Sequence, residues 1–125
     1  MADLTFVEVS ATNKARCTRW HPGYPAPDAS GWSGADWSNA MQGEAGEAGN
    51  VVKKLRRAEV GLRGVLDGER EVLLGQLAEE IADTFLYLDL LATYYEIDLP
   101  SAVVAKFNAV SELQGFPERL QTTVR

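Results

Sequence analysis

Apolar residues recur at intervals of three and four along most of the chain, which is the spacing of one face of an α-helix. The pattern is strongest in residues 69–96, and residues 35–59 repeat it over a similar length. Shorter stretches with the same period cover residues 4–19 and 100–113. In the strongest stretch the periodic positions are Leu73, Leu77, Ile81, Phe85, Leu88, Leu91 and Tyr95. The sequence therefore predicts four helices, of which two are long.

Glycine and proline punctuate the chain between these stretches, and both residues favour turns and loops. The breaks lie at residues 21–34, 61–68, 97–100 and 115–117. Ser33 or Asp36 can cap the second helix, because short polar side chains accept hydrogen bonds from the first free N–H groups. Pro100 fits the first turn of the last helix, where its missing N–H costs nothing.

Only the first stretch allows a second interpretation. Thr5, Val7 and Val9 also suit a β-strand, because β-branched side chains fit a pleated sheet. No run in the chain alternates for long enough to predict a sheet. We therefore expect an all-α fold, a helical bundle of about four helices with two long central helices, in which residues 1–125 form a single domain.

The composition excludes several classes of protein. The 125 residues are 46% hydrophobic and 24% charged, which is ordinary for a globular domain. Eighteen acidic residues against twelve basic ones give a net charge of −6, which argues against a nucleic-acid partner. Cys17 is the only cysteine, so neither an intrachain disulfide nor a cysteine-based zinc site is expected. The longest apolar stretch, residues 85–95, contains Asp89 and is too short to span a membrane. We expect a cytoplasmic protein without a membrane partner.

The two long helices carry acidic pairs at a spacing that puts both members on one face. Glu44 and Glu47 are three residues apart in the second helix, and Glu80 and Asp83 are three apart in the third. If the two helices face each other, four carboxylates converge, and repulsion and desolvation destabilise such a cluster unless a cation compensates it. Ligands that are all oxygen favour Mg²⁺, with Mn²⁺ as the alternative. The pattern predicts a site for a divalent metal ion.

Small residues surround the first acidic pair. Gly43, Gly46 and Gly49 recur at every third position, although glycine costs a helix roughly 1 kcal/mol relative to alanine. We interpret them as letting the helices approach closely and leaving volume for a ligand, with Asn50 beside them. The alternative is a buried salt-bridge network, in which Lys or Arg from elsewhere in the chain neutralises the acids.

The segment GEAGEAGNVVKKL at residues 43–55, followed by EEIAD at residues 79–83, resembles the MazG-like all-α nucleoside triphosphate pyrophosphohydrolases. The hallmark of that family is E-x-x-E on one helix and E-x-x-D on the next. The resemblance covers roughly residues 16–120. Its further parts are Trp37-Ser38, the segment before Pro100, and residues 106–117.

The resemblance implies a reaction and a set of residues. Such proteins cleave the α–β phosphoanhydride of a nucleoside triphosphate, giving the monophosphate and pyrophosphate, and they need Mg²⁺ or Mn²⁺. They usually form homodimers or homotetramers with the site between helices of neighbouring subunits. Lys106 and Asn108 match a position that contacts substrate in the family. The positions that match the metal ligands are Glu44, Glu47, Glu80 and Asp83.

One position departs from the family pattern. Many relatives have a second acid directly before E-x-x-E, which can orient or deprotonate the attacking water, and this chain has Gly43 there. We expect Glu47 or Glu79 to take that catalytic role. Because no phosphate-binding G-x-x-x-x-G-K-[ST] loop is present, metal ions would have to neutralise the triphosphate.

Lys54 and Trp37 are further candidates for substrate binding, and they and Lys106 each have a structural alternative. Lys54 lies two turns beyond Glu47 and can reach a phosphate, or it belongs to a solvated helix end. Trp37 can stack on a nucleobase, or it packs in the core. Lys106 has the alternative of being a surface lysine, and Asn50 accompanies the acidic pair.

Two further functions fit the same pattern. A catalytically silent helical dimerisation module would keep the fold without metal dependence. A regulatory nucleotide-binding protein would bind the triphosphate without turning it over. Pyrophosphate release with Mg²⁺ separates the enzyme from both.

Overall fold

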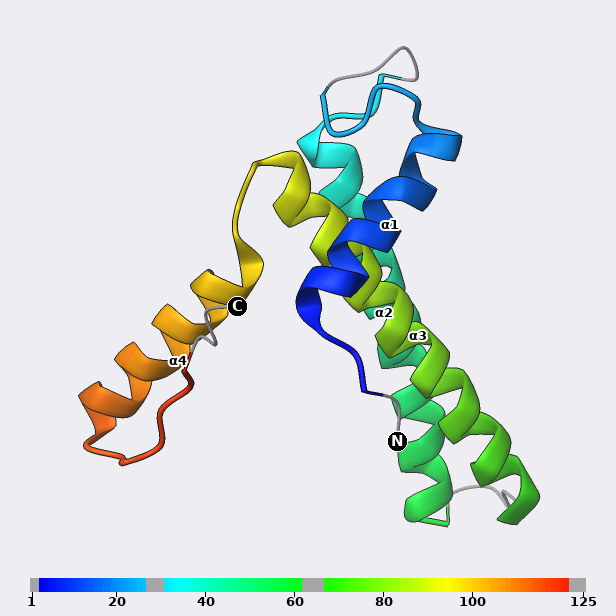
Figure 1. Cartoon of the computed structure of the whole chain (residues 1–125). Helices are drawn as coiled ribbons and strands as arrows, with labels where there is room; N and C mark the ends of the chain where they lie inside the picture. Colours follow the sequence, from blue (N-terminus) through cyan, green and yellow to red (C-terminus); the bar gives the residue numbers. More distant parts are fainter. Residues whose placement is uncertain (1–2, 27–30, 62–66, 122–125) are drawn as a thin grey trace. The chain divides into compact units, whose positions relative to one another are not determined.

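The structure is a computed structural model that describes residues 3–26, 31–61 and 67–121. Those residues contain four helices and no strand (Figure 1). The helices are α1 (Phe6–Trp20), α2 (Gly34–Glu59), α3 (Asp67–Tyr94) and α4 (Leu99–Gln114). The predicted all-α class with two long helices is confirmed, since α2 and α3 have 26 and 28 residues. None of the helices in the described part of the chain has the length and hydropathy needed to cross a membrane.

The chain divides into two compact units. One comprises Met1–Ser30 together with Ala92–Arg125, and the other comprises Gly31–Leu91. The first unit contains α1 and α4, and the second contains α2 and most of α3. The prediction that residues 1–125 form a single domain stays a prediction.

In the second unit α2 and α3 run antiparallel as a hairpin (Figure 1). Trp37, Val51 and Leu55 of α2 are buried, and they share one face of the helix because they lie whole turns apart. The ring of Trp37 contacts that of Tyr87 on α3, with centroids 6.4 Å apart. This contact shows which residues of the two helices lie opposite each other.

Both residues predicted to cap α2 take part in its cap. Ser33 is the N-cap residue, and the carboxylate of Asp36 accepts hydrogen bonds from the Ser33 N–H at 2.7 Å and from its hydroxyl at 2.9 Å. The backbone hydrogen bond lowers the pKa of Asp36, and the hydroxyl lowers it further. Together these two hydrogen bonds fix the start of α2.

The first predicted helix is a helix and not a strand, and it begins two residues later than expected. Thr5 is its N-cap, its hydroxyl accepts from the Glu8 N–H at 3.2 Å, and the Glu8 carboxylate accepts from the Thr5 N–H at 2.9 Å. This T-x-x-E capping box is visible in the sequence and outweighs the β-branched residues around it.

The third helix ends at Tyr94 rather than at the expected Glu96. Glu96 has a φ of 55°, and the Ile97 N–H donates to the Ala92 carbonyl at 2.9 Å, which closes the helix end. Pro100 lies in the first turn of α4, as predicted. Residues 27–30 and 62–66, which belong to two of the predicted breaks, lie outside the described residues.

Candidate metal centre

Three of the four predicted carboxylates meet in the second unit. Oxygen atoms of Glu44 on α2 and of Glu80 and Asp83 on α3 all lie within 4.8 Å of one another. Glu44 and Glu80 are half-buried, and Asp83 is exposed. The chain therefore brings oxygen ligands from both long helices to one point.

The register of the hairpin explains this convergence. Glu44 follows Trp37 by seven residues, and Glu80 precedes Tyr87 by seven. Because the helices are antiparallel, both steps move the same way along the hairpin, by about 10 Å at 1.5 Å per residue. Seven residues are also close to two whole turns, so each acid keeps the facing direction of its aromatic residue. The register in which Trp37 meets Tyr87 thus also places Glu44 opposite Glu80.

Burial and the neighbouring acids both act on the carboxyl group of Glu80. Its pKa is raised above the ordinary 4.5, first because the side chain is partly desolvated. A hydrogen bond with Glu44, which favours a protonated Glu80, and the negative charges of Glu44, Glu47 and Asp83 raise the pKa further. Desolvation and like charges both disfavour an ionised carboxyl group, so a cation at this point would relieve both effects.

Glu47 lies at the edge of the cluster and not within it. Its side chain is exposed, and it is not among the three whose oxygens meet within 4.8 Å. Three residues turn a helix by about 300°, so Glu47 points some 60° away from Glu44. Its charge nevertheless acts on Glu80. Glu79, the other predicted catalytic acid, is exposed and contributes nothing to the raised pKa of Glu80.

The salt-bridge network considered as an alternative finds no support. Within the described residues no lysine or arginine forms an ion pair with Glu44, Glu47, Glu80 or Asp83. At the C-terminal end of α2, Arg56 forms an ion pair within its own helix, with its Nη1 3.8 Å from Glu59 Oε2. The acids therefore repel each other without compensation from the described basic residues.

The glycines beside the first acidic pair do not bring the two helices together. A Cβ atom added at Gly43, Gly46 or Gly49 would meet no atom of the described residues within 4 Å. The expectation that they permit a close helix approach was wrong for the hairpin, because they face open space. The second expectation, that they leave volume next to the acids, agrees with this open surface.

The predicted substrate residues on α2 divide into exposed and buried ones. Asn50 and Lys54 are exposed and share a face with Glu47, since they follow it by three and by seven residues. Trp37 is only 2% exposed. Its ring contacts those of Trp32, with centroids 4.6 Å apart, and of Tyr87. Trp37 is thus a core residue, which was the structural alternative considered for it.

Tyr87 is an aromatic residue near the acidic cluster that was not predicted from the sequence to belong to the site. It follows Asp83 by four residues, so it lies one turn away on the same face of α3, and it is half-buried. The four-residue spacing from Asp83 is the sequence feature that could have identified Tyr87. Lys106 and Asn108 belong to α4 in the other unit, where Lys106 is exposed and the amide of Asn108 binds the backbone of Leu120.

The donor set fits a hard divalent cation. It offers carboxylate oxygens only, from Glu44, Glu80 and Asp83, and the exposure of Asp83 leaves access for solvent. Mg²⁺ binds in this way, through a few carboxylates and several retained waters. Comparisons of the chain with protein-family models, with curated proteins and with solved structures found no match. The geometry and charge of the acidic cluster therefore define the candidate site.

Proposed function

We propose that this chain is a nucleoside triphosphate pyrophosphohydrolase that uses Mg²⁺, or Mn²⁺ in its place, as the MazG-like resemblance implies. The reaction would cleave the α–β phosphoanhydride of a (d)NTP to give the monophosphate and pyrophosphate. The observation that carries the proposal is the meeting of Glu44, Glu80 and Asp83 within 4.8 Å with no described basic partner. A cytoplasmic setting, expected from the composition, is part of the same proposal.

The three carboxylates would hold the cation. A divalent ion there would supply the positive charge that a triphosphate needs beside acidic residues, and it would make nearby water more acidic. The half-buried Glu44 and Glu80 come from different helices, so the hairpin fixes their separation before substrate arrives. Preformed ligand geometry reduces the reorganisation that the reaction requires.

Glu47 is the better candidate for accepting the proton of the attacking water. It is exposed and uninvolved in the meeting of the three oxygens, yet close enough for its charge to act on Glu80. Glu79 has no such influence. Asn50 and Lys54 continue the exposed face of Glu47 along α2, and there they can contact phosphate or sugar oxygens.

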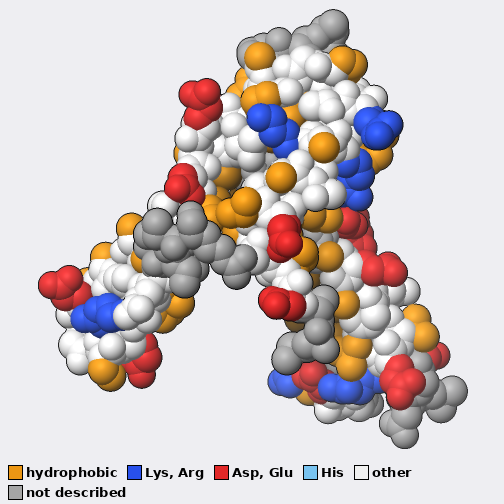
Figure 2. Space-filling view, viewed as in Figure 1, with side chains coloured by type: hydrophobic (Ala, Val, Ile, Leu, Met, Phe, Trp, Pro, Cys, Tyr) orange, Lys and Arg blue, Asp and Glu red, His pale blue; other side chains and the backbone are white. Residues whose placement is uncertain are grey.

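We further propose that the protein is a homo-oligomer, a dimer or a tetramer. On α3 Leu74, Ile81 and Leu88 recur every seven residues, and all three remain exposed as an apolar stripe. Figure 2 shows hydrophobic side chains on the surface of the hairpin among acidic ones. Sedimentation should give a species of at least twice the 13.7 kDa of one chain, and a stable monomer at micromolar concentration would contradict this part.

Pyrophosphate release tests the function. The purified chain should be incubated with each common and deaminated (d)NTP in Mg²⁺, in Mn²⁺ and in EDTA. We expect release with one or more nucleotides, in the presence of metal only, and its loss in Glu80→Gln. Glu71→Gln, an exposed acid of the same helix outside the cluster, is the matched control. Tight triphosphate binding without release would favour the regulatory alternative, and neither binding nor release would favour a silent module.

A further inference from the structure

The C-terminal part of the first unit folds back on α4. Gly115 follows the last helical residue with a φ of 72°, a left-handed conformation that glycine adopts without a steric penalty. The Phe116 N–H donates to the Ser111 carbonyl at 2.8 Å, and the Gly115 N–H donates to the Glu112 carbonyl at 3.1 Å. This pair of bonds is a Schellman motif, and it directs the chain away from the helix axis.

The side chain of Asn108 holds the returning chain. Its Nδ2 donates to the Leu120 carbonyl at 2.9 Å, and the Leu120 N–H donates to Asn108 Oδ1 at 2.8 Å. Donor and acceptor of one side-chain amide thus pair with both backbone groups of one residue, as two strands do in an antiparallel sheet. The bonded residues are twelve positions apart, so the pair closes a loop and not a helical turn.

Arg119 braces the middle of this loop. Its Nη1 donates to the Phe116 carbonyl at 2.6 Å and to the Glu118 carbonyl at 2.9 Å. Pro117, between them, has a fixed φ and no N–H to satisfy. We call residues 115–121 the strap. It is held at its start by the helix cap, in its middle by Arg119 and at its end by Asn108.

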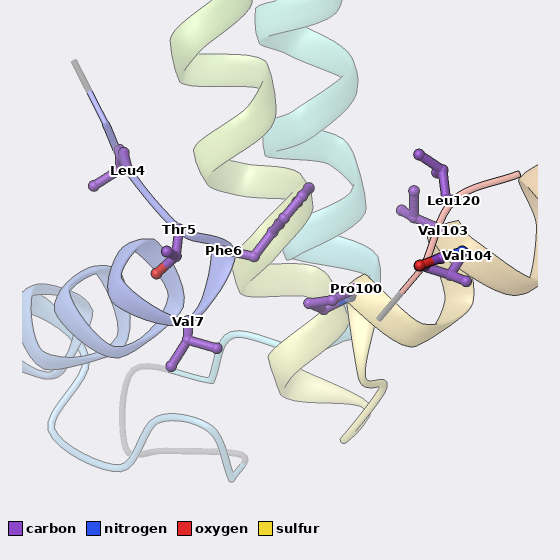
Figure 3. A pocket seen from close by; sticks show the side chains of 9 residues that line it. Leu4, Thr5, Phe6, Val7, Pro100, Val103, Val104 and Leu120 are labelled. Atoms are coloured by element: carbon purple, nitrogen blue, oxygen red, sulfur yellow. The ribbon is translucent and has the colours of Figure 1, made fainter. Parts of the chain in front are cut away.

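The end of the strap forms one wall of an apolar groove. Leu120 and Gln121 line this groove, which has a volume of about 380 Å³, and in Figure 3 Leu120 lies on the same side as Val103 and Val104. The other lining residues are Leu4, Thr5, Phe6, Val7 and Pro100. Two backbone bonds to Asn108 place Leu120, so that side chain supports this wall of the groove.

We infer that Asn108 is the latch of the C-terminal strap, a positioning role that is separate from the proposed hydrolysis. The observation behind it is the reciprocal bond pair, which fixes the amide plane to the Leu120 backbone. Without the latch, the helix cap and Arg119 still turn the chain, but the two backbone bonds that hold Leu120 against α4 are lost. The strap then opens from its C-terminal end, and the groove loses its wall.

Backbone amide exchange, measured by NMR on the full chain, tests the latch. In Asn108→Ala the Leu120 amide should exchange about tenfold faster or more, because two hydrogen bonds are lost. Asn108→Asp keeps an acceptor for the Leu120 N–H but loses the Nδ2 donor, so a smaller acceleration is expected. Glu112→Ala, which removes an exposed side chain of the same helix, should leave the Leu120 rate unchanged.

The amides in the middle of α2 and α3 report whether each variant is folded, and their rates should stay at the wild-type level. An unchanged Leu120 rate in Asn108→Ala would overturn the inference. Equal acceleration of every α4 amide would also overturn it, because Asn108 would then support the helix and not the strap.

Discussion

Replacing Glu80 by glutamine changes the charge of the candidate metal centre with little change in shape. Glu80 is the carboxyl group on which desolvation, Glu44, Glu47 and Asp83 all act, and all of them raise its pKa. A carboxyl group with a raised folded-state pKa binds protons more tightly in the folded state, so its ionisation destabilises the fold. The neutral amide removes this destabilisation. In EDTA at pH 7 we expect Glu80→Gln to melt at or above the wild-type temperature.

The pH dependence has a definite sign. Below the ordinary pKa of 4.5 Glu80 is protonated in both the folded and the unfolded chain, so wild type and variant should be equally stable there. As the pH rises from 4.5 through the raised pKa, the wild type should lose stability relative to the variant. Above the raised pKa the difference should stay constant.

Metal binding reverses the order of the two melting temperatures, so in Mg²⁺ the wild type should melt above Glu80→Gln. A site filled at one hundred times its Kd stabilises the fold by about 2.7 kcal/mol. For a chain of this length that corresponds to roughly 8–14 °C, at about 3–5 °C per kcal/mol. Losing one of three carboxylates weakens the site, and a tenfold loss of affinity halves the shift to about 1.4 kcal/mol. A hundredfold loss leaves about 0.4 kcal/mol.

Thermal unfolding of wild type, Glu80→Gln and the control Glu71→Gln, each in EDTA and in Mg²⁺, measures both effects. The control should keep the wild-type Mg²⁺ shift. The reasoning fails if Glu80→Gln melts several degrees below the wild type in EDTA, because Glu80 would then neutralise a cation of the protein. It also fails if Glu80→Gln retains the full Mg²⁺ shift, or if the wild type shows none.

Three further substitutions have expected outcomes. Glu47→Gln should abolish pyrophosphate release and leave the apo protein as stable as the wild type or more so, which turnover and melting in EDTA can check; a large destabilisation would mean that Glu47 belongs to an ion pair. Glu96→Gly should stabilise the fold by about 0.5–1 kcal/mol in urea unfolding, because glycine adopts the φ of 55° without a steric penalty; lower stability would show that the Glu96 side chain makes a compensating contact. Asp36→Asn should lower the free energy of unfolding at neutral pH, but not at a pH below the lowered pKa of Asp36. Hydrogen bonds from Ser33 lower the pKa of Asp36, so its contribution is present above the ordinary 3.8 and is lost as the pH falls through the lowered pKa. Urea unfolding at several pH values should show the two proteins converging, and a constant difference would contradict the cap.

The long helices could be predicted because their apolar period is strong and uninterrupted. The ends of the helices were harder to predict from the sequence. The end of α3 depends on Glu96 adopting a positive φ, which is uncommon for a residue other than glycine, and no local signal announces it. The start of α1 could have been found, because Thr5 and Glu8 form a capping box that the sequence displays.

The sequence predicts that acidic residues form the candidate site, but it does not predict which of them meet. Spacing places Glu44 and Glu47 near one face, yet it does not say how two helices are aligned, and the 60° between the two side chains decides which one joins Glu80. That alignment is a tertiary property, seen in the contact of Trp37 with Tyr87. The bonds of Asn108 to Leu120 are likewise tertiary, since they span a turn that sequence periodicity does not describe.

The products formed from a (d)NTP test the central proposal most directly. A ³¹P NMR time course with the nucleotide that gives the highest turnover, in Mg²⁺, should show the triphosphate signals replaced by those of pyrophosphate and the nucleoside monophosphate. The same sample with Glu80→Gln should stay at the triphosphate. Formation of the diphosphate and inorganic phosphate, or equal turnover by the variant, would contradict α–β hydrolysis at the Glu44, Glu80 and Asp83 centre.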